Sequence, residues 1–378
     1  MKLIHLSDLH IGKRVNEFSL IDDQKYILNE IISIVANEQA DCVIIAGDVY
    51  DKPMPSAEAV ALFDRFLTQL SAIGKPVIII SGNHDSAERL AFGADIMSSN
   101  GVYMSHAYSG RLDRVTLHDE FGEVNIYLLP FIKPANVRAV FDGADISNYT
   151  EAVRTAILCG EVDFSQRSVL VAHQFVTGAD TSESEEISVG GLDNVDAAAF
   201  DGFDYVALGH IHSPQNIGDG HIRYCGTPLK YSFSEINQQK SVTVAELDGS
   251  GLRDVRTVPL TPLHDMRQLR GSYDELSARR NYDGTATDDY LRIILTDEQD
   301  VPDAIGRLRA IYPNIMRIEY DNARTRNGGS VGVADEAVVA SPIDLFGQLY
   351  ERQNGRPMDD EQRGVINAMI EKIWGTQQ

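Results

Sequence analysis

Short apolar runs alternate with helical patterns through about the first 260 residues of the chain. Strands are predicted at LIHL (3–6), CVIIA (42–46) and VIII (77–80), and helices over 24–37, 57–73 and 87–100. Further apolar runs predict strands at 124–129, 169–172, 205–208, 222–225 and 242–247. Strands that alternate with helices at this spacing are typical of a layered α/β fold. Two sheets packed face to face and flanked by helices would use all of these strands.

The pattern restarts after Pro259 and Pro262. Strands at 291–295 and 315–320, with a helix over 302–311 between them, predict a small β-α-β unit. A stretch rich in glycine and small residues then lacks any periodicity, which is typical of a flexible linker. We therefore expect four parts: a main domain over 1–262, a small α+β domain over 263–323, a linker over 324–340 and C-terminal helices over 341–378.

Two helices are predicted beyond the linker, the first beginning at Ser341-Pro342. Each carries an apolar stripe at helical spacing, made of Ile343, Phe346, Leu349 and Tyr350 in the first helix and of Val365, Ile366, Met369, Ile370, Ile373 and Trp374 in the second. Such stripes usually pack on their own chain. The tether and the only tryptophan of the chain favour docking on a partner instead.

Composition is that of a soluble globular protein, with 43% hydrophobic and 24% charged residues among 378. No stretch approaches the roughly 20 apolar residues of a membrane span, and the first residues lack a signal-peptide core, so we expect a cytoplasmic protein. Three scattered cysteines predict neither disulfides nor a zinc site. A net charge of −23 disfavours a nucleic-acid partner unless bound metal ions change the local charge. The acidic segment 177–191 is expected to be a solvated loop.

Polar side chains gather where predicted strands end. The five turns carry Asp8 and His10; Asp48 and Asp51; Asn83, His84 and Asp85; His173; and His210 and His212. A single such histidine would most often be a buried, hydrogen-bonded imidazole. Five turns of this kind indicate a shared site, because ligands bind at the carboxyl ends of strands in open α/β sheets. Asp, Asn and several His make a poor core and a suitable cage for two divalent ions.

These motifs resemble the calcineurin-like metallophosphoesterase superfamily, whose pattern D-x-H, GD-x-x-D, GNH-D/E, H and GH-x-H occurs here complete and in order. The resemblance implies a two-sheet β-sandwich flanked by helices. It also implies that one ion is held by Asp8, His10, Asp48 and His212, and the other by Asp48, Asn83, His173 and His210. His84 would contact the scissile phosphate or protonate the leaving oxygen, with Asp51 and Asp85 as supporting residues.

Manganese is the metal that the family implies, with magnesium as an alternative, and the ligand types alone leave iron and zinc open. The surrounding segments GDVYDKPMPS (47–56), SGNHDSAERL (81–90), FDYVALGHIHSPQ (203–215) and CGTPLKYSFSE (225–235) resemble the branch of DNA-repair nucleases. That branch implies double-strand exonuclease and single-strand or hairpin endonuclease activity in DNA repair, recombination and replication. It also implies a homodimer that joins a coiled-coil ABC ATPase in a heterotetramer, with the C-terminal helices gripping the base of the coiled coil.

The small domain resembles the cap that helps such nucleases hold DNA, through Arg267, Arg270, Arg279, Arg280, Arg307 and Arg309. Ordinary surface arginines balanced by nearby acids are the alternative. The sequence has no GxxxxGK[ST] motif, so any ATP dependence would come from the partner. Two other functions remain open: a small-molecule or phosphoprotein phosphoesterase on the same core, and a scaffold without metal. The scaffold would be expected to lack a ligand, and none is missing.

Overall fold

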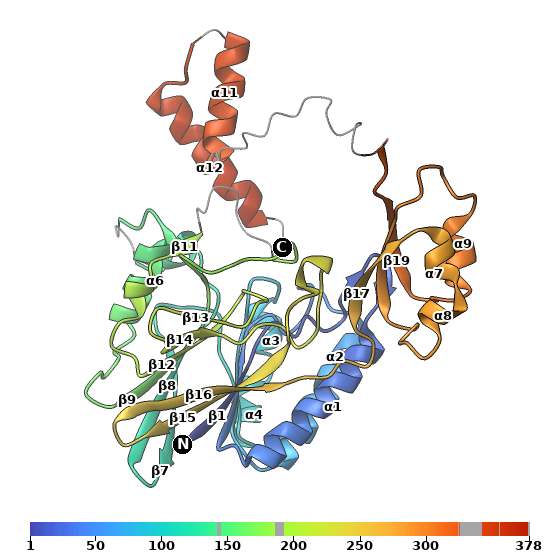
Figure 1. Cartoon of the computed structure of the whole chain (residues 1–378). Helices are drawn as coiled ribbons and strands as arrows, with labels where there is room; N and C mark the ends of the chain where they lie inside the picture. Colours follow the sequence, from blue (N-terminus) through green and yellow to red (C-terminus); the bar gives the residue numbers. More distant parts are fainter. Residues whose placement is uncertain (142–144, 186–192, 324, 326–341, 355, 377–378) are drawn as a thin grey trace.

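The computed structural model describes the chain except residues 142–144, 186–192, 324, 326–341, 355 and 377–378 (Figure 1). Its centre is a pair of six-stranded sheets. The first has the order β16-β15-β1-β4-β5-β6, with β16 Gly251–Pro259, β15 Ser241–Asp248, β1 Lys2–Leu6, β4 Cys42–Ala46, β5 Val77–Ile80 and β6 Val102–Met104. From β1 to β6 its strands are parallel, whereas β15 and β16 run antiparallel to their neighbours.

The second sheet has the order β13-β14-β12-β9-β8-β7. Its strands are β13 Gln215–Ile217, β14 Ile222–Tyr224, β12 Tyr205–Gly209, β9 Arg167–His173, β8 Gly122–Leu129 and β7 Asp113–Asp119. The four central strands are parallel and the two edge strands antiparallel. Short strand pairs lie outside the sheets: β2 Arg14–Val15 with β3 Phe18–Ser19, and β10 Phe175–Val176 with β11 Asn194–Val195.

The two sheets pack face to face through a core to which Leu3, Ile44 and Ile78 contribute from one side and Ile126 and Val171 from the other. Helices α1 (Ile21–Glu38) and α2 (Ala57–Ala72) cover the outer face of the first sheet. Helices α5 (Pro134–Arg138) and α6 (Tyr149–Leu158) cover that of the second. Parallel strands buried on both faces read as continuous apolar runs, which is why CVIIA and VIII were recognisable. The predicted two-sheet α/β sandwich is confirmed.

One predicted helix is wrong in its extent. Residues 87–100 form two short helices, α3 (Ala87–Leu90) and α4 (Ala94–Ser98), because Gly93 between them has a φ of 77°. A left-handed residue cannot continue a right-handed helix, and glycine adopts that conformation without steric strain.

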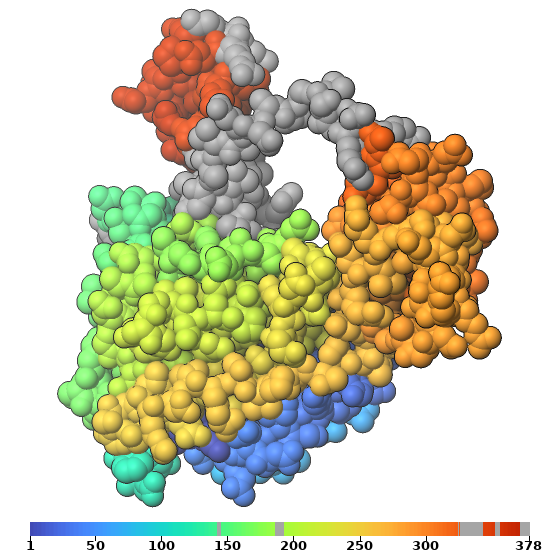
Figure 2. Space-filling view, viewed as in Figure 1, coloured from blue at the N-terminus to red at the C-terminus, as the bar shows by residue number. Residues whose placement is uncertain are grey.

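The small domain, called the cap here, contains the parallel strands β17 (Met266–Gly271), β18 (Tyr290–Leu295) and β19 (Ile315–Tyr320). Helices α7 (Tyr273–Ser277), α8 (Arg279–Tyr282) and α9 (Ala304–Arg309) accompany them around a separate core. In Figure 2 the cap, in orange, abuts the two-sheet domain. Asp23 of α1 links the two, because it accepts hydrogen bonds from Tyr290 Oη at 2.8 Å and from the main chain of His264 at 3.1 Å. The domain boundary at 262 stays a prediction.

Helices α11 (Pro342–Asn354) and α12 (Asp360–Thr376) follow, and Tyr350 and Gln362 join them through a side-chain hydrogen bond of 3.1 Å. The predicted linker lies outside the described residues, apart from Thr325, and so does the side chain of Trp374. Leu349 is 52% exposed and Val365 56%. Among the helices that the structure describes, none combines the length and the apolar character that crossing a bilayer requires.

Candidate metal centre

The predicted ligands lie at the carboxyl ends of strands from both sheets. Those from the first sheet follow β1, β4 and β5, and those from the second end β9 or follow β12. Asp8, His10, Asp48 and His210 have positive φ values of 51°, 43°, 49° and 98°. Non-glycine residues rarely adopt such values, and backbone strain of this kind concentrates at functional sites. The turns are therefore bent so that their side chains share one space.

Two glycines allow the strand ends to approach each other closely. A Cβ atom on Gly47 would lie 2.3 Å from His173 Nδ1, and one on Gly209 would lie 2.0 Å from the carbonyl oxygen of Ala46. Real Cβ atoms do not come this close to other heavy atoms, so larger residues would push the strand ends apart. The glycines thus bring His173 of the second sheet against the first.

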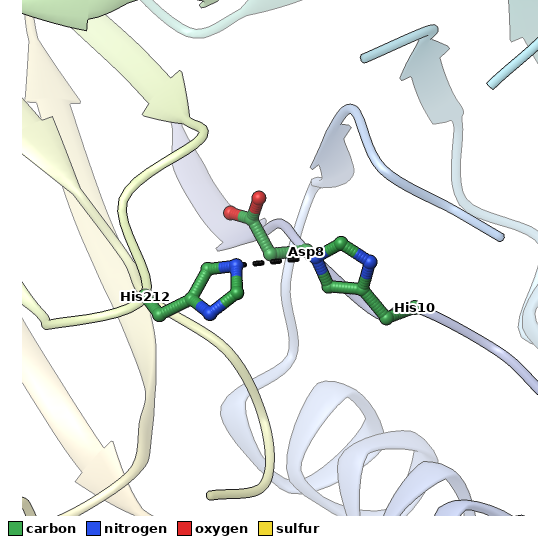
Figure 3. Close-up of side chains that lie close together, drawn as sticks. All are labelled: Asp8, His10 and His212. Carbon is green, nitrogen blue, oxygen red and sulfur yellow. Dashed lines mark hydrogen bonds between the residues drawn. The ribbon is translucent and has the colours of Figure 1, made fainter. Parts of the chain in front are cut away.

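One group of side chains consists of Asp8, His10 and His212, which offer ligand atoms within 4.8 Å of one another. Figure 3 shows the rings of His10 and His212 facing each other beside Asp8, and their Nε2 atoms are 3.1 Å apart. All three are at most 2% exposed. Asp48 adjoins this group, since its Oδ2 lies 3.7 Å from His10 Nε2.

A second group shares Asp48. His173 Nε2 lies 3.3 Å from Asp48 Oδ2 and 3.0 Å from Asn83 Oδ1. His210 Nδ1 lies 2.9 Å from the same Asn83 oxygen, and the main-chain N–H of His210 donates to Asp8 at 3.0 Å. The structure thus brings together all seven residues predicted as ligands, with Asp48 between the two groups.

This donor set fits divalent cations. Imidazole nitrogens, carboxylates and an amide oxygen suit manganese and its neighbours in the first transition row. Two imidazole nitrogens that face each other at 3.1 Å, beside a buried carboxylate, present lone pairs that a cation can satisfy together. Burying Asp8 and Asp48 is costly unless positive charge compensates them.

Burial and neighbouring charge act in opposite directions on these groups. Burial raises the pKa of Asp8 to about 6. Burial also tends to raise that of Asp48, but His173 and His84 outweigh it and hold the Asp48 pKa well below its usual range. For His173, burial is outweighed by Asp48, which raises the pKa to about 9, whereas burial lowers that of His210 to about 3. Asp48 is thus the carboxylate most strongly kept ionised between the two groups.

The three residues predicted to support the chemistry have different environments. The main-chain N–H of His84 donates to Asp48 Oδ1 at 2.8 Å, and its ring lies 4.9 Å from that of His10. His84 Nδ1 lies 3.1 Å from the carbonyl oxygen of Asp51, whose carboxylate pairs with Lys13 Nζ at 2.8 Å. Asp51 therefore orients the His84 ring through its main chain.

Asp85 acts on the backbone. Its carboxylate accepts hydrogen bonds of 3.0 Å from the main-chain N–H groups of Val49, Tyr50 and Gly82. It therefore ties the turn after β4 to the turn after β5, which carry Asp48 and Asn83.

The sequence did not predict the residues that bind the backbone or the rings of the ligand turns on the side away from the metal centre. Gln24 Nε2 donates to the carbonyl oxygen of His10 at 2.8 Å, and Tyr231 Oη donates to that of Leu9 at 2.6 Å. Ser184 Oγ lies 2.6 Å from His212 Nδ1, so the prediction of a solvated loop over 177–191 is wrong at this residue. Its only sequence signal was the polar character of the segment, which solvated loops share.

Comparison with known proteins identifies the families that the chain matches. The family described as calcineurin-like phosphoesterase matches residues 1–214, and the family described as type 5 capsule protein repressor C-terminal domain matches residues 262–354. The chain is 34% identical to the D subunit of the nuclease SbcCD from Staphylococcus epidermidis, over 98% of this chain and 100% of that protein.

Two solved structures are also similar. A dimetal phosphatase from Danio rerio has 11% identity and a TM-score of 0.39, over 69% of this chain and 99% of that one. A protein of Thermus thermophilus has 13% identity and a TM-score of 0.41, over 68% of this chain and 98% of that one.

Proposed function

The chain belongs to the calcineurin-like phosphoesterase family, and from this premise we propose that it is a DNA nuclease that hydrolyses phosphodiester bonds with two divalent ions. The observation that carries the proposal is the pair of ligand groups around Asp48. One ion would be held by Asp8, His10, Asp48 and His212, and the other by Asp48, Asn83, His173 and His210. We propose manganese as the metal, with magnesium as the alternative.

A bound pair of divalent ions lowers the pKa of a bound water and neutralises the charge of the phosphate oxygens. The chain itself supplies orientation and a proton. His84 is held through its main chain by Asp48, and its Nδ1 is placed to donate to the carbonyl of Asp51. With Nδ1–H so engaged, the protonated imidazolium form of His84 carries its second proton on Nε2. This proton can pass to the leaving oxygen, which leaves a neutral ring with its hydrogen on Nδ1. Such general acid catalysis contributes roughly 10²- to 10⁴-fold in rate.

A nucleic acid as the substrate is supported by the name of the Staphylococcus epidermidis relative, which is a nuclease subunit, and by the extent of the match to it; we propose that this nucleic acid is DNA. We propose double-strand exonuclease and single-strand or hairpin endonuclease activity, in repair and recombination. The arginines of the cap give mixed support for DNA binding. Arg267 pairs with Asp289 at 2.5 Å and Arg270 pairs with Asp321, which favours the alternative that these are ordinary surface arginines balanced by nearby acids. Arg307 lies over the ring of Tyr273 instead, 4.3 Å from its centroid.

For partners, we propose an SbcC-type coiled-coil ABC ATPase and a second copy of this chain. The exposed side chains of Leu349, Val365 and Met369 on α11 and α12 would dock on the coiled coil. Phe92 and Ile96, which are 84% and 76% exposed, would lie in the homodimer contact. The complex would then be a heterotetramer.

The test uses the full chain with manganese on end-labelled linear duplex and hairpin DNA, with and without the ATPase partner and ATP. We expect nucleotide release that falls roughly 10²- to 10⁴-fold in His84→Gln while manganese binding is kept. Intact DNA under every condition, together with turnover of a small phosphodiester, would favour the phosphoesterase alternative. Retained DNA cleavage in His84→Gln would contradict the role of His84.

A further inference from the structure

A buried ion pair lies behind the ligand His212. Glu235 is 0% exposed and Lys240 4% exposed, and Glu235 Oε2 lies 2.7 Å from Lys240 Nζ. Glu235 ends the short 3₁₀ helix Phe233–Glu235, and Lys240 immediately precedes β15. Both residues lie outside the motifs that supply the ligands.

The pair contacts both the side chain and the main chain of His212. On one side, Ser184 Oγ bonds Glu235 Oε1 and lies 2.6 Å from His212 Nδ1. On the other, Lys240 Nζ donates to the carbonyl oxygen of His212 at 2.9 Å. The opposite nitrogen of the ring, Nε2, faces His10 in the metal centre.

The hydrogen bonds also decide which ring nitrogen carries the proton. An ionised carboxylate can only accept, so the Ser184 hydroxyl donates its hydrogen to Glu235. The lone pairs of that hydroxyl then accept from His212 Nδ1–H. In this tautomer Nε2 has no hydrogen, and its lone pair points toward the metal centre.

Stability alone does not account for such a pair. The loss of hydration that accompanies burying two charges often exceeds their attraction, and apolar residues of similar size would serve the fold as well. Residues behind a ligand that orient it and fix its tautomer, in contrast, typically change metal affinity 10- to 100-fold when altered.

We propose that Glu235 and Lys240 are positioning residues that hold His212, through Ser184 and through its main chain, as a metal ligand with its lone pair on Nε2. This proposal rests on the proposed function. It adds three residues to those that the ligand motifs contain, and it gives the segment 232–240 a role in metal binding.

The experiment measures manganese binding to the full, metal-free chain by isothermal titration calorimetry, counting both ions. Glu235→Gln and Ser184→Ala test the side-chain route, and Lys240→Met tests the main-chain route. We expect each variant to lower the affinity for one of the two ions about 10- to 100-fold. Ser184→Thr keeps the hydroxyl and should bind as wild type does. Glu38→Gln is the matched control, because Glu38 pairs with Arg256 outside the ligand groups.

A second readout is the tautomer of His212, measured by ¹⁵N NMR of histidine-labelled, metal-free protein and assigned with His212→Gln. We expect Nδ1–H in wild type and a shift toward Nε2–H in Glu235→Gln, because the side-chain amide can turn its NH₂ group to Ser184. A purely structural role would leave the tautomer unchanged in folded protein. If Glu235→Gln does not fold, the comparison of Ser184→Ala with Ser184→Thr decides.

Two negative results have different meanings. If wild type binds two ions and Glu235→Gln, Ser184→Ala and Lys240→Met bind both equally well, the positioning role is overturned and the proposed nuclease stands. If wild type binds neither manganese nor magnesium in the same titration, the proposed function itself is overturned.

Discussion

Gly82 is the position where the smallest change should disturb the metal centre most directly. It follows β5 and precedes Asn83, and its N–H donates to Asp85 at 3.0 Å. A Cβ atom at this position would lie 2.1 Å from Asp48 Oδ1, 2.5 Å from Asp48 N and 2.7 Å from Asp48 Cγ. Gly82→Ala therefore introduces one methyl group against the residue that both ligand groups share.

The size of the effect follows from these distances. The new methyl group would be more than 1 Å closer to the carboxylate than an ordinary contact allows, and one of the opposing atoms is backbone. Overpacking of this kind costs about 1–3 kcal/mol, and a displacement of about 1 Å in a catalytic group costs roughly 10²-fold in rate. We therefore expect the melting temperature to fall by about 2–10 °C and DNA hydrolysis by roughly 10²-fold or more.

The assay combines thermal unfolding, manganese titration and hydrolysis of labelled DNA by the chain without its partner. Gly364→Ala of α12 is the matched control, because a Cβ there meets no atom within 4 Å and alanine favours a helix over glycine by about 1 kcal/mol. Wild-type manganese affinity and a wild-type rate in Gly82→Ala would refute the reasoning.

Three further predictions concern stability and partners. Asp119→Asn should lower the free energy of unfolding by about 2–3 kcal/mol at pH 7, because Arg167 donates to both carboxylate oxygens, at 2.9 and 2.6 Å. Arg167 holds the pKa of Asp119 well below its usual range. The difference in free energy of unfolding between wild type and Asp119→Asn is therefore fully present above the Asp119 pKa of the unfolded chain, about 4. It shrinks as the pH falls from there toward the lower pKa of the folded chain. Urea unfolding of wild type and Asp119→Asn at pH 7 and pH 3 checks this, and an equal difference in free energy of unfolding at the two pH values would contradict it. Ile96→Asp should give a monomer by light scattering, and a persistent dimer would rule out Ile96 as part of the homodimer contact. Leu349→Asp should lose capture of the coiled-coil ATPase while circular dichroism shows its helices intact; unimpaired capture would place docking elsewhere.

Much of the fold could be predicted because its central strands are buried on both faces. CVIIA and VIII are apolar without interruption, as is typical of parallel strands that are buried on both faces. The edge strands β7 and β16 were not predicted, because DRVTLHD and GLRDVRTVP carry charges on their solvent-facing sides. The predicted helix over 87–100 was too long because nothing local showed that Gly93 would adopt a positive φ.

The ligand residues were predictable for a related reason. A strand end in a parallel sheet has a fixed direction, so polar residues after the apolar runs of one sheet point to one edge of that sheet. Three of the runs belong to the first sheet and two to the second, and the packing of the sheets brings the two edges together. The geometry places all seven near Asp48, although their role as ligands remains a proposal. The roles of Asp51 and Asp85 were less accessible, since Asp51 reaches His84 through a carbonyl and Asp85 binds backbone N–H groups of two turns. Backbone groups are the same in every residue and leave no mark on the sequence.

The sequence by itself determined the alternation of strands and helices, the order of the motifs and the kinds of atoms offered to a metal. These depend on side-chain chemistry and on spacing along the strand, both of which are local. Only the tertiary structure decided that Ser184, Glu235 and Lys240 lie behind His212, although Ser184 and Glu235 are separated along the chain by 51 positions. Contacts of that kind depend on how two sheets and their turns pack, and packing is a property of the whole folded chain.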